Sequence, residues 1–402
     1  MKAIILAAGK GSRLNPLTKY RPKHLLPIAG KPLIEHIIVE LKNAGIEDIG
    51  LIVGYMKNKI MDIISDGRKY GVKVKYIIQE EPLGTAHAIK MAEEYVGSER
   101  FIVVYGDVTF NRQVLWEALE KHERYKASTT IVATEVEDPW NYGVMEIDEK
   151  GFLKNIVEKP EMGMELSKQV NTGIYVMEGS KIFNAINVTP KSKRGEYEIT
   201  DTFKKLLEIG ERIFVYNAGR NWWRDLGRPW DLLEANEDYM NRNEFYRNGI
   251  FVGCGSIIGS ECIIKPPTII GRNCKIGSKS IIGPYAFIGD NVEIGFKSKI
   301  SMSIVMEYTC IMNGCDVNYS VIGSNCIIEG DVKFMYEYAD GRNVKMRIKG
   351  VEVDTGRSRM GSVIGDYSYI GCGSIIMPGI TIYPNSIVTR NKMVYFDVDG
   401  FY

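Results

Sequence analysis

The feature that most constrains this 402-residue chain is a six-residue repeat in its second half. An aliphatic residue recurs at every sixth position, and glycine follows it directly in all cases but one. The unbroken run consists of Val252, Ile258, Ile264, Ile270, Ile276, Ile282, Ile288 and Ile294. This period predicts a triangular coil in which each flat face directs one aliphatic side chain inward. The following residue turns the corner, where glycine tolerates a positive φ.

The repeat continues to the end of the chain with one interruption. It weakens after Ile300 and returns at Ile322, Ile328, Ile364, Ile370 and Ile376. A charged, tyrosine-bearing insertion at about 333–360 is expected to project as a loop or hairpin. The segment resembles the left-handed parallel β-helix of the hexapeptide-repeat family, whose members commonly form trimers. The resemblance implies a β-helix domain over 250–402 and a homotrimer or a multiple of one.

The first half has a different period, in which short apolar strands alternate with amphipathic helices. Strands are predicted at 3–7, 49–53, 72–78 and 101–105, and helices at 33–44, 58–65 and 86–95. This alternation favours a mostly parallel sheet wound on both sides, with ligands beyond the carboxyl ends of its strands. The predicted architecture is therefore a Rossmann-like α/β domain over 1–235, a linker helix over 236–249 and the β-helix.

Composition argues against several classes of protein. The net charge of +1 comes from scattered residues, which gives no electrostatic case for nucleic acid or a membrane surface. The apolar runs are far shorter than the roughly 20 residues of a membrane span, and no signal-like segment opens the chain, so a cytoplasmic protein is expected. All seven cysteines lie between Cys254 and Cys372 without the spacing of a metal site, and we expect free buried thiols.

Small residues follow the first predicted strand. The run is Leu6, Ala7, Ala8, Gly9, Lys10, Gly11, Ser12, Arg13 and Leu14. Its backbone N–H groups can approach a phosphate closely. A Walker loop would need glycine at Ile4 and a hydroxyl residue at Gly11, and a dinucleotide fingerprint would need glycine at Leu14. Taken alone, the run also fits a plain strand-to-helix turn.

Further motifs follow the loop in a definite order. They are Arg21-Pro22-Lys23, Gln79 to Ala88, Tyr105-Gly106-Asp107, Tyr142-Gly143-Val144, Glu158-Lys159-Pro160, Asn171-Thr172-Gly173 and Trp223 to Gly227. Together they resemble the signature of sugar-1-phosphate nucleotidylyltransferases. With its repeats, the chain resembles long glucose-1-phosphate thymidylyltransferases and enzymes related to the bifunctional N-acetylglucosamine-1-phosphate uridylyltransferase/glucosamine-1-phosphate acetyltransferase. The resemblance implies transfer from UTP or dTTP to the 1-phosphate of glucose or N-acetylglucosamine, with release of pyrophosphate.

The resemblance assigns four catalytic residues. Arg13 is expected against the β- and γ-phosphates and Lys23 against the α-phosphate. Asp107 and Asp225 are expected to hold Mg²⁺, which keeps several waters and needs only one or two carboxylates. The non-catalytic alternatives are helix N-caps for the aspartates and solvated surface groups for the cations.

The remaining predicted site residues bind the nucleotide and the sugar phosphate. The nucleotide set is Leu6, Ala7, Ala8, Gly9, Gly11, Gln79, Gly84 and Thr85, and the sugar-phosphate set is Tyr105, Gly143, Glu158, Lys159 and Asn171. The Gln79 amide offers a donor and an acceptor to a pyrimidine edge. Lys159 is expected to hold the sugar's phosphate, whereas His87 is interpreted as structural.

The second half lacks an obvious catalytic group. Hexapeptide-repeat acyltransferases typically use a histidine as general base, and no histidine follows His122. A scaffold or regulatory module is the preferred interpretation, with Lys345, Lys349, Arg357 and Arg359 on a solvated hairpin. The alternative is a bifunctional enzyme that also acetylates an amino-sugar 1-phosphate with acetyl-CoA. A non-catalytic regulatory homologue is the third hypothesis, although all four predicted catalytic residues are present.

Overall fold

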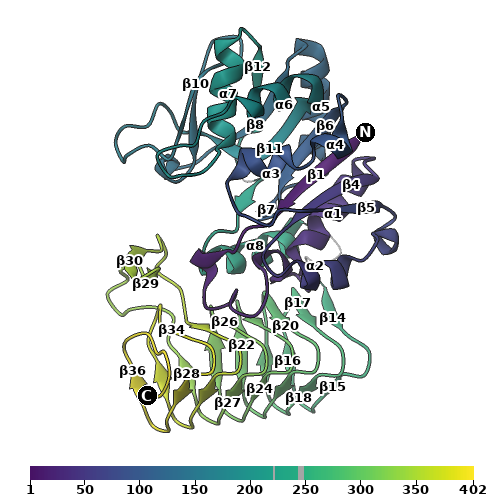
Figure 1. Cartoon of the computed structure of the whole chain (residues 1–402). Helices are drawn as coiled ribbons and strands as arrows, with labels where there is room; N and C mark the ends of the chain where they lie inside the picture. Colours follow the sequence, from purple (N-terminus) through teal and green to yellow (C-terminus); the bar gives the residue numbers. More distant parts are fainter. Residues whose placement is uncertain (221, 243–248) are drawn as a thin grey trace. The chain divides into compact units, whose positions relative to one another are not determined.

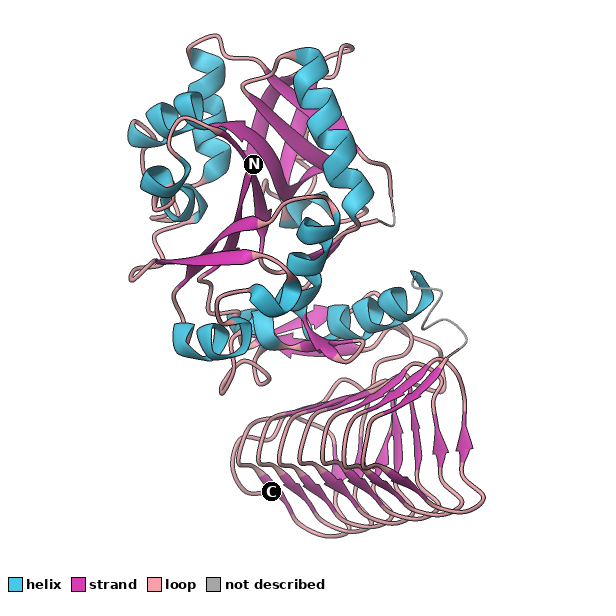
Figure 2. Cartoon of the chain, turned by 90° about the vertical axis from the view of Figure 1, so that its right-hand side faces the viewer, coloured by secondary structure: helices cyan, strands magenta, loops and turns pink. Residues whose placement is uncertain are grey.

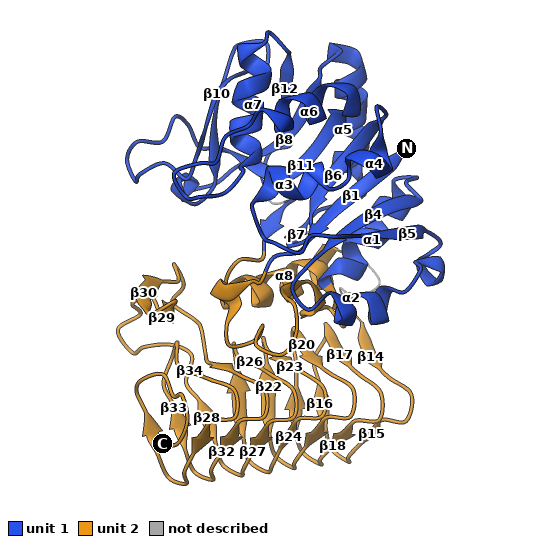
Figure 3. Cartoon of the chain, viewed as in Figure 1, with its two compact units in different colours: residues 1–9, 33–225 blue, residues 10–32, 226–402 orange. Residues whose placement is uncertain are grey.

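The computed structural model describes residues 1–220, 222–242 and 249–402 (Figure 1). It divides into two compact units, one of residues 1–9 and 33–225, the other of residues 10–32 and 226–402 (Figure 3). The segment 10–32 thus groups with the second half of the chain rather than with the α/β domain. Part of the predicted linker helix is present in α8 (Pro229–Arg242), whereas its residues 243–248 lie outside the described residues.

The first unit contains a mixed nine-stranded sheet with helices on both sides (Figure 2). Its order is β10-β9-β11-β6-β1-β4-β5, with β8 beside β11 and β12 beside β8. Strands β1, β4, β5 and β6 run parallel, whereas β11 pairs antiparallel with β6. The strands of the sheet are β1 (Lys2–Ala7), β4 (Asp48–Val53), β5 (Lys73–Ile78), β6 (Arg100–Tyr105), β8 (Thr129–Glu135), β9 (Gly143–Ile147), β10 (Leu153–Glu158), β11 (Gln169–Glu178) and β12 (Ile213–Asn217). A separate two-stranded sheet contains β7 (Val108–Thr109) and β13 (Arg224–Asp225).

The helices of this unit follow the predicted apolar periodicity. Helix α1 (Leu33–Asn43) buries Leu33, Ile34, Ile37, Ile38 and Leu41, which share one face at helical spacing. The segment predicted as one helix over 86–95 forms two, α3 and α4. The other helices are α2 (Lys57–Ile64), α3 (Thr85–Lys90), α4 (Glu93–Val96), α5 (Arg112–Tyr125), α6 (Gly179–Asn187) and α7 (Ile199–Glu208). None of the described helices has the length and apolar character needed to cross a bilayer.

The repeats form three parallel seven-stranded sheets, the predicted left-handed β-helix (Figure 2). The first sheet contains β14 (Ile250–Val252), β17 (Thr268–Ile270), β20 (Ala286–Ile288), β23 (Ile304–Val305), β26 (Val321–Ile322), β31 (Val363–Ile364) and β34 (Thr381–Ile382). The second contains β15 (Ile257–Ile258), β18 (Lys275–Ile276), β21 (Glu293–Ile294), β24 (Cys310–Ile311), β27 (Ile327–Ile328), β32 (Tyr369–Ile370) and β35 (Ile387–Val388). The third contains β16 (Ile263–Ile264), β19 (Ile281–Ile282), β22 (Lys299–Ser301), β25 (Asp316–Asn318), β28 (Lys333–Phe334), β33 (Ile375–Ile376) and β36 (Met393–Val394).

Shorter coils explain why the repeat weakens after Ile300. Val252 pairs with Ile270, 18 residues later, whereas Ile288 pairs with Val305, only 17 residues later. One corner of the coil has therefore lost a residue. Inward aliphatic side chains still stack in register, and Ile322 follows Val305 after another 17 residues. The repeat is thus continuous in space although its sequence period changes.

The predicted reason for the corner glycines is wrong at most positions. Gly271, Gly277 and Gly289 do not adopt a positive φ. A Cβ on Gly277 would lie 2.4 Å from the Phe296 backbone nitrogen of the next coil, so the glycine is needed for close stacking. The positive φ falls two residues later, for example 55° at Asn273. Gly283, with φ 89°, fits the original expectation.

The insertion forms the predicted hairpin, with strands β29 (Lys345–Ile348) and β30 (Val351–Asp354). The cysteines are free thiols as predicted, but the prediction that they are buried holds only for Cys274, Cys315 and Cys326. Cys254 is exposed, and Cys262, Cys310 and Cys372 are partly buried. Burial raises the pKa of Cys315 to about 11, which argues against its use as a nucleophile.

Candidate active site

The carboxyl ends of three parallel strands bring the predicted base-binding residues together. Gly54 follows β4, which lies between β1 and β5. A Cβ on Gly54 would lie 2.8 Å from the Gln79 carbonyl oxygen and 3.0 Å from the Ala8 Cβ. Ala8 and Gln79 therefore pack on either side of Gly54, as the predicted sheet edge requires. The Gly106 amide, after β6, donates to the Leu6 carbonyl at 2.9 Å.

His87 orients the Gln79 side chain. The Gln79 Nε2 and His87 Nδ1 atoms lie 2.8 Å apart, and the Gln79 side chain is buried. Burial lowers the pKa of His87, with a smaller effect from Lys90, so the neutral ring can accept from the amide. This contact fits the structural role predicted for His87, and it leaves the other donor and the acceptor of Gln79 for a ligand.

Gly84 and Thr85 pack against a segment that sequence reasoning did not select. Gly84 has φ 112°, and a Cβ there would lie 2.5 Å from the Tyr197 carbonyl oxygen. The Ile199 amide donates to the Thr85 hydroxyl at 2.9 Å. These contacts hold the predicted nucleotide loop against the start of α7.

We expect Gln79→Glu to raise the KM for a pyrimidine nucleotide about 10–100-fold, because a buried donor is lost and a charge is introduced. The measurement is steady-state kinetics with UTP and dTTP at saturating hexose 1-phosphate. A matched variant, Gln113→Glu on the surface of α5, should leave KM unchanged. An unchanged KM for Gln79→Glu would exclude base recognition by this side chain.

The predicted sugar-phosphate residues converge around Gly143. Gly143 pairs with Glu158 across strands β9 and β10. A Cβ on Gly143 would lie 3.1 Å from the Glu158 Oε2 and 3.4 Å from the Asn171 Cβ. Lys159 has its ammonium 3.8 Å from Glu158 Oε1. The Tyr175 hydroxyl donates to the Tyr105 hydroxyl at 3.2 Å.

Arg194 and Glu198 join this cluster, and sequence reasoning missed both. Arg194 Nη1 lies 3.7 Å from Glu158 Oε1 and 3.1 Å from Glu198 Oε1. The Glu198 oxygen forms no hydrogen bond with a described residue, so the Arg194 contact is an ion pair with poor hydrogen-bond geometry. The buried Glu198 has its pKa raised to about 7 by burial and by the neighbouring Glu158. The one sequence signal that could have identified these two residues is their position in a charged loop before α7.

The raised pKa of Glu198 predicts a pH effect on sugar-phosphate binding. Above pH 7 its carboxylate adds negative charge beside the predicted phosphate site, so KM for hexose 1-phosphate should rise on the order of tenfold between pH 6 and pH 8. Because the folded-state pKa lies above the ordinary value, the group's contribution to stability is also lost as pH rises from about 4.5 to about 7.

The check is a KM profile against pH for the wild type and Glu198→Gln. The variant should lose this part of the pH dependence while keeping any part that belongs to the substrate's own phosphate. Identical profiles would contradict the placement of Glu198 beside the sugar phosphate.

A short antiparallel ladder brings the backbones of the two predicted metal ligands close together. Asp225, in β13, pairs with Val108 of β7, and Asp107 directly precedes Val108. The two aspartates are therefore neighbours across the ladder although 118 positions separate them in sequence. No group of three or more metal-ligating side chains occurs among the described residues. A pair of carboxylates is nevertheless enough for magnesium, which takes its remaining ligands from water and phosphate.

The predicted phosphate cations lie in the second unit around a small pocket of about 160 Å³. It is lined by Gly11, Ser12, Arg13, Leu14, Lys23, Leu226, Gly227 and Lys349. Gly11 has φ 66°, and a Cβ there would lie 2.8 Å from the Lys23 Cβ. Glycine at position 11 thus allows the backbone there to pack closely against the Lys23 side chain. Arg13 and Lys23 line the same pocket.

Arg21, from the same motif as Lys23, has a different environment. Its Nη2 donates to Asp366 Oδ2 at 2.9 Å and to the Ser324 hydroxyl at 2.8 Å. Asp366 and Ser324 lie at buried corners of the β-helix. Arg21 therefore anchors the phosphate loop to the coils, and sequence alone could not separate this role from that of Lys23.

Sequence comparisons with known proteins cover nearly the whole chain. Residues 2–242 match the nucleotidyl transferase family, and residues 264–391 match the GMPPB C-terminal domain family. The bifunctional protein GlmU of Methanococcus maripaludis is 37% identical, over 99% of this chain and 96% of that protein. A bifunctional sugar-1-phosphate nucleotidylyltransferase/acetyltransferase of Sulfurisphaera tokodaii is 32% identical, over 97% and 98% of the two chains.

A structural comparison covers part of the chain. The solved structure is a Bacillus anthracis protein provisionally identified as a glucose-1-phosphate thymidylyltransferase, in complex with a sucrose. It is 35% identical, with a TM-score of 0.53, over 59% of this chain and 94% of that chain. The chain therefore belongs to the nucleotidyl transferase family, as a sugar-1-phosphate nucleotidyltransferase with a C-terminal β-helix.

Proposed function

We propose that the enzyme joins a hexose 1-phosphate to the nucleotidyl group of UTP or dTTP, with magnesium, and releases pyrophosphate. The observation that carries the proposal is the β7–β13 ladder, which makes neighbours of Asp107 and Asp225. The hexose is glucose or N-acetylglucosamine. Gln79, held by His87, supports a pyrimidine as the base.

The chemistry requires positioning more than reactive protein groups. An oxygen of the sugar phosphate attacks the α-phosphorus in line, and the bond to the β-phosphate oxygen breaks. In our proposal Arg13 binds the β- and γ-phosphates, Lys23 the α-phosphate and Lys159 the attacking phosphate. Bound Mg²⁺, held by Asp107 and Asp225, would neutralise charge at the α-phosphate. The attacker is already an anion, so no protein nucleophile is needed.

A substrate panel tests the proposal. Pyrophosphate release is measured with UTP, dTTP, ATP and GTP, each against glucose 1-phosphate and N-acetylglucosamine 1-phosphate, with and without Mg²⁺. Metal-dependent release with a pyrimidine nucleotide at least about tenfold faster than with purines supports it. No release with any hexose 1-phosphate contradicts it.

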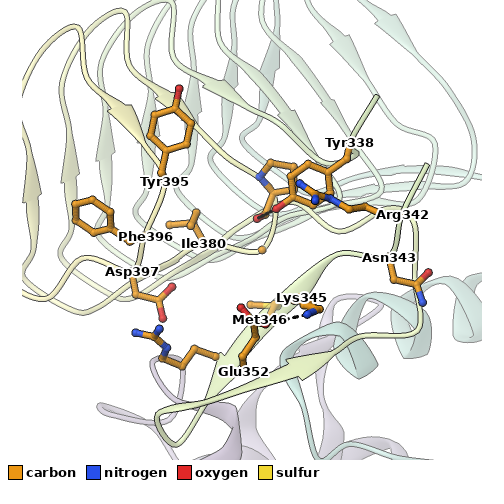
Figure 4. A pocket seen from close by; sticks show the side chains of 13 residues that line it. Tyr338, Arg342, Asn343, Lys345, Met346, Glu352, Ile380, Tyr395, Phe396 and Asp397 are labelled. Atoms are coloured by element: carbon orange, nitrogen blue, oxygen red, sulfur yellow. Dashed lines mark hydrogen bonds and ion pairs between the residues drawn. The ribbon is translucent and has the colours of Figure 1, made fainter. Parts of the chain in front are cut away.

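A second candidate function is acetyl transfer by the β-helix unit. The relatives of M. maripaludis and S. tokodaii are named as bifunctional and match almost the whole chain, which favours this alternative over the scaffold interpretation. A pocket of about 340 Å³ lies between the insertion and the last coils. Figure 4 shows Lys345 and Glu352 on the hairpin opposite Tyr395 and Asp397. Basic and aromatic side chains of this kind suit a phosphate-bearing, adenine-containing cofactor.

Asp397 is our candidate for the base that no histidine supplies. Its Oδ1 accepts from the Thr381 amide at 2.8 Å, whereas its buried Oδ2 finds no donor among the described residues. Burial raises the pKa of this carboxyl, which makes the carboxylate a better proton acceptor. The substrate amine would attack the thioester carbon and pass its proton to Asp397. The carbon–sulfur bond then breaks, and coenzyme A leaves as the thiol after taking up that proton.

Thiol release from acetyl-CoA with glucosamine 1-phosphate tests the second function. Asp397→Asn should remove this activity while pyrophosphate release continues unchanged. The exposed Asp399→Asn is the matched control and should retain both. Absence of thiol release from the wild type with amino-sugar phosphates would contradict this second function and favour the scaffold interpretation.

We also propose a homotrimer, as the β-helix resemblance implies. Ile257, Ile327 and Ile387 project from the second β-helix sheet and are exposed in the single chain, which suits contact with another subunit. Sedimentation equilibrium should give three times the chain mass of 45.4 kDa. A monomer at micromolar concentration would contradict this proposal.

A further inference from the structure

We propose that Lys349, at the tip of the β-helix insertion, is a third cation of the triphosphate pocket and binds the phosphates that leave as pyrophosphate. The inference rests on the proposed nucleotidyl transfer and adds a residue to its site. It starts from the pocket of about 160 Å³, where Lys349 lines the same space as Arg13 and Lys23. Lys349 lies more than 300 positions beyond these two residues in the sequence.

The hairpin fixes the position of Lys349. Strands β29 and β30 pair up to Ile348 and Val351, so the turn contains only Lys349 and Gly350. Their φ values are 50° and 81°, both positive, as a type I′ turn requires. Asparagine or glycine is the usual first residue of such a turn. Lysine at this position thus places a long cationic side chain where the turn does not favour it.

The base of the hairpin is held to the second unit. Arg357 forms an ion pair with Glu234 of α8. Arg359 Nε donates to Glu337 at 2.9 Å, and Met346 of β29 is buried. These contacts tie the hairpin to the same unit that carries the phosphate loop, so its tip is presented to the pocket on an anchored support.

The charged side chains that line the pocket are all cationic. They belong to Arg13, Lys23 and Lys349. The three other hairpin cations that sequence analysis singled out are engaged, since Lys345 contacts Glu352 at 3.0 Å and the two arginines pair as above. Lys349 forms no ion pair with any residue that the structure describes. Three cations around one small space favour a ligand with several negative charges.

Pyrophosphate and the β- and γ-phosphates of a nucleotide have this charge. An ammonium group binds such oxygens as a compact point charge, whereas an arginine can contact two oxygens at once. Arg13, which we propose to bind the β- and γ-phosphates, lines the same pocket as Lys349. We therefore assign the leaving phosphates to Lys349. The repeat unit would then supply a substrate-binding residue to the reaction of the first half of the chain.

Calorimetric titration of magnesium pyrophosphate into the full-length protein tests the inference without turnover. Lys349→Gln should raise Kd about tenfold, and Lys349→Arg should restore binding to within about threefold of wild type. Lys297→Gln is the matched control, because Lys297 is also exposed with a positive φ of 57° and lines no described pocket. In kinetics, Lys349→Gln should raise KM for the nucleotide but not for hexose 1-phosphate.

The two proposals fail in different ways. Wild-type binding of pyrophosphate by Lys349→Gln would overturn the role of Lys349, whatever the enzyme's activity. If the variant binds pyrophosphate tenfold more weakly than the wild type, and the wild type turns over no hexose 1-phosphate, the cation site is supported and the proposed function is rejected. Equal weakening by Lys297→Gln would show a general loss of charge and would overturn the assignment.

Discussion

Asp107→Ala should lower kcat for pyrophosphate release on the order of 10²–10³-fold, because it removes a carboxylate from the proposed magnesium site and several kcal/mol of charge stabilisation with it. Asp225→Ala should cause a similar loss. The double variant should be little worse than either single one, since both side chains serve one ion and their effects are not additive. The measurement is kcat at saturating substrates, with Tm recorded for each variant.

Asp62→Ala is the matched control, because Asp62 is an exposed aspartate on α2 away from the ladder. It should retain full activity. The thermal melt of Asp107→Ala should stay near that of the wild type. Activity that survives Asp107→Ala would exclude this aspartate as a metal ligand, and additive losses in the double variant would argue against a shared ion.

Asp366→Ala should destabilise the protein by about 3–5 kcal/mol, because it leaves the Arg21 guanidinium in a site from which its buried partner has been removed. Chemical denaturation measures this loss. The same variant should raise KM for the nucleotide, since Arg21 anchors the segment that carries Lys23. Asp290→Ala is the matched control, as the exposed pair of Asp290 and Arg272 should contribute only about 0–1 kcal/mol.

A combined Arg21→Met, Asp366→Leu variant separates the two effects. Replacing both charges by apolar groups should recover much of the stability. It should not restore the nucleotide KM if the ion pair sets the position of the loop. Full recovery of KM by this variant would show that Arg21 contributes only to stability.

The repeat made the β-helix predictable because each coil places the same chemical type at the same inward position. Periodicity also located the strands and helices of the first unit as far as residue 105, since buried faces follow a fixed spacing. The reason for the corner glycines was not predictable in the same way. Gly277 is needed because of the Phe296 backbone, and a contact between neighbouring coils leaves no trace in local sequence.

The candidate site likewise has residues that the sequence predicted and residues that only the structure revealed. Motif order predicted which strand ends carry Gln79 and Asp107, because ligands gather at the carboxyl edge of a parallel sheet. The ladder between β7 and β13 supplied the neighbour relation that sequence could only assume. Arg194 was missed and Lys349 was assigned to a solvated hairpin, because both lie in charged segments, where a cation usually remains in solvent. Tertiary contacts alone distinguish them from ordinary surface residues.

The most direct test of the account is the position of the metal. Crystals grown with Mn²⁺ and a non-hydrolysable UTP analogue would be measured at the manganese absorption edge. We expect one anomalous peak within coordination distance of the Asp107 and Asp225 carboxylates and of an α-phosphate oxygen. A nucleotide bound with its metal elsewhere, or with neither carboxylate near that ion, would contradict it.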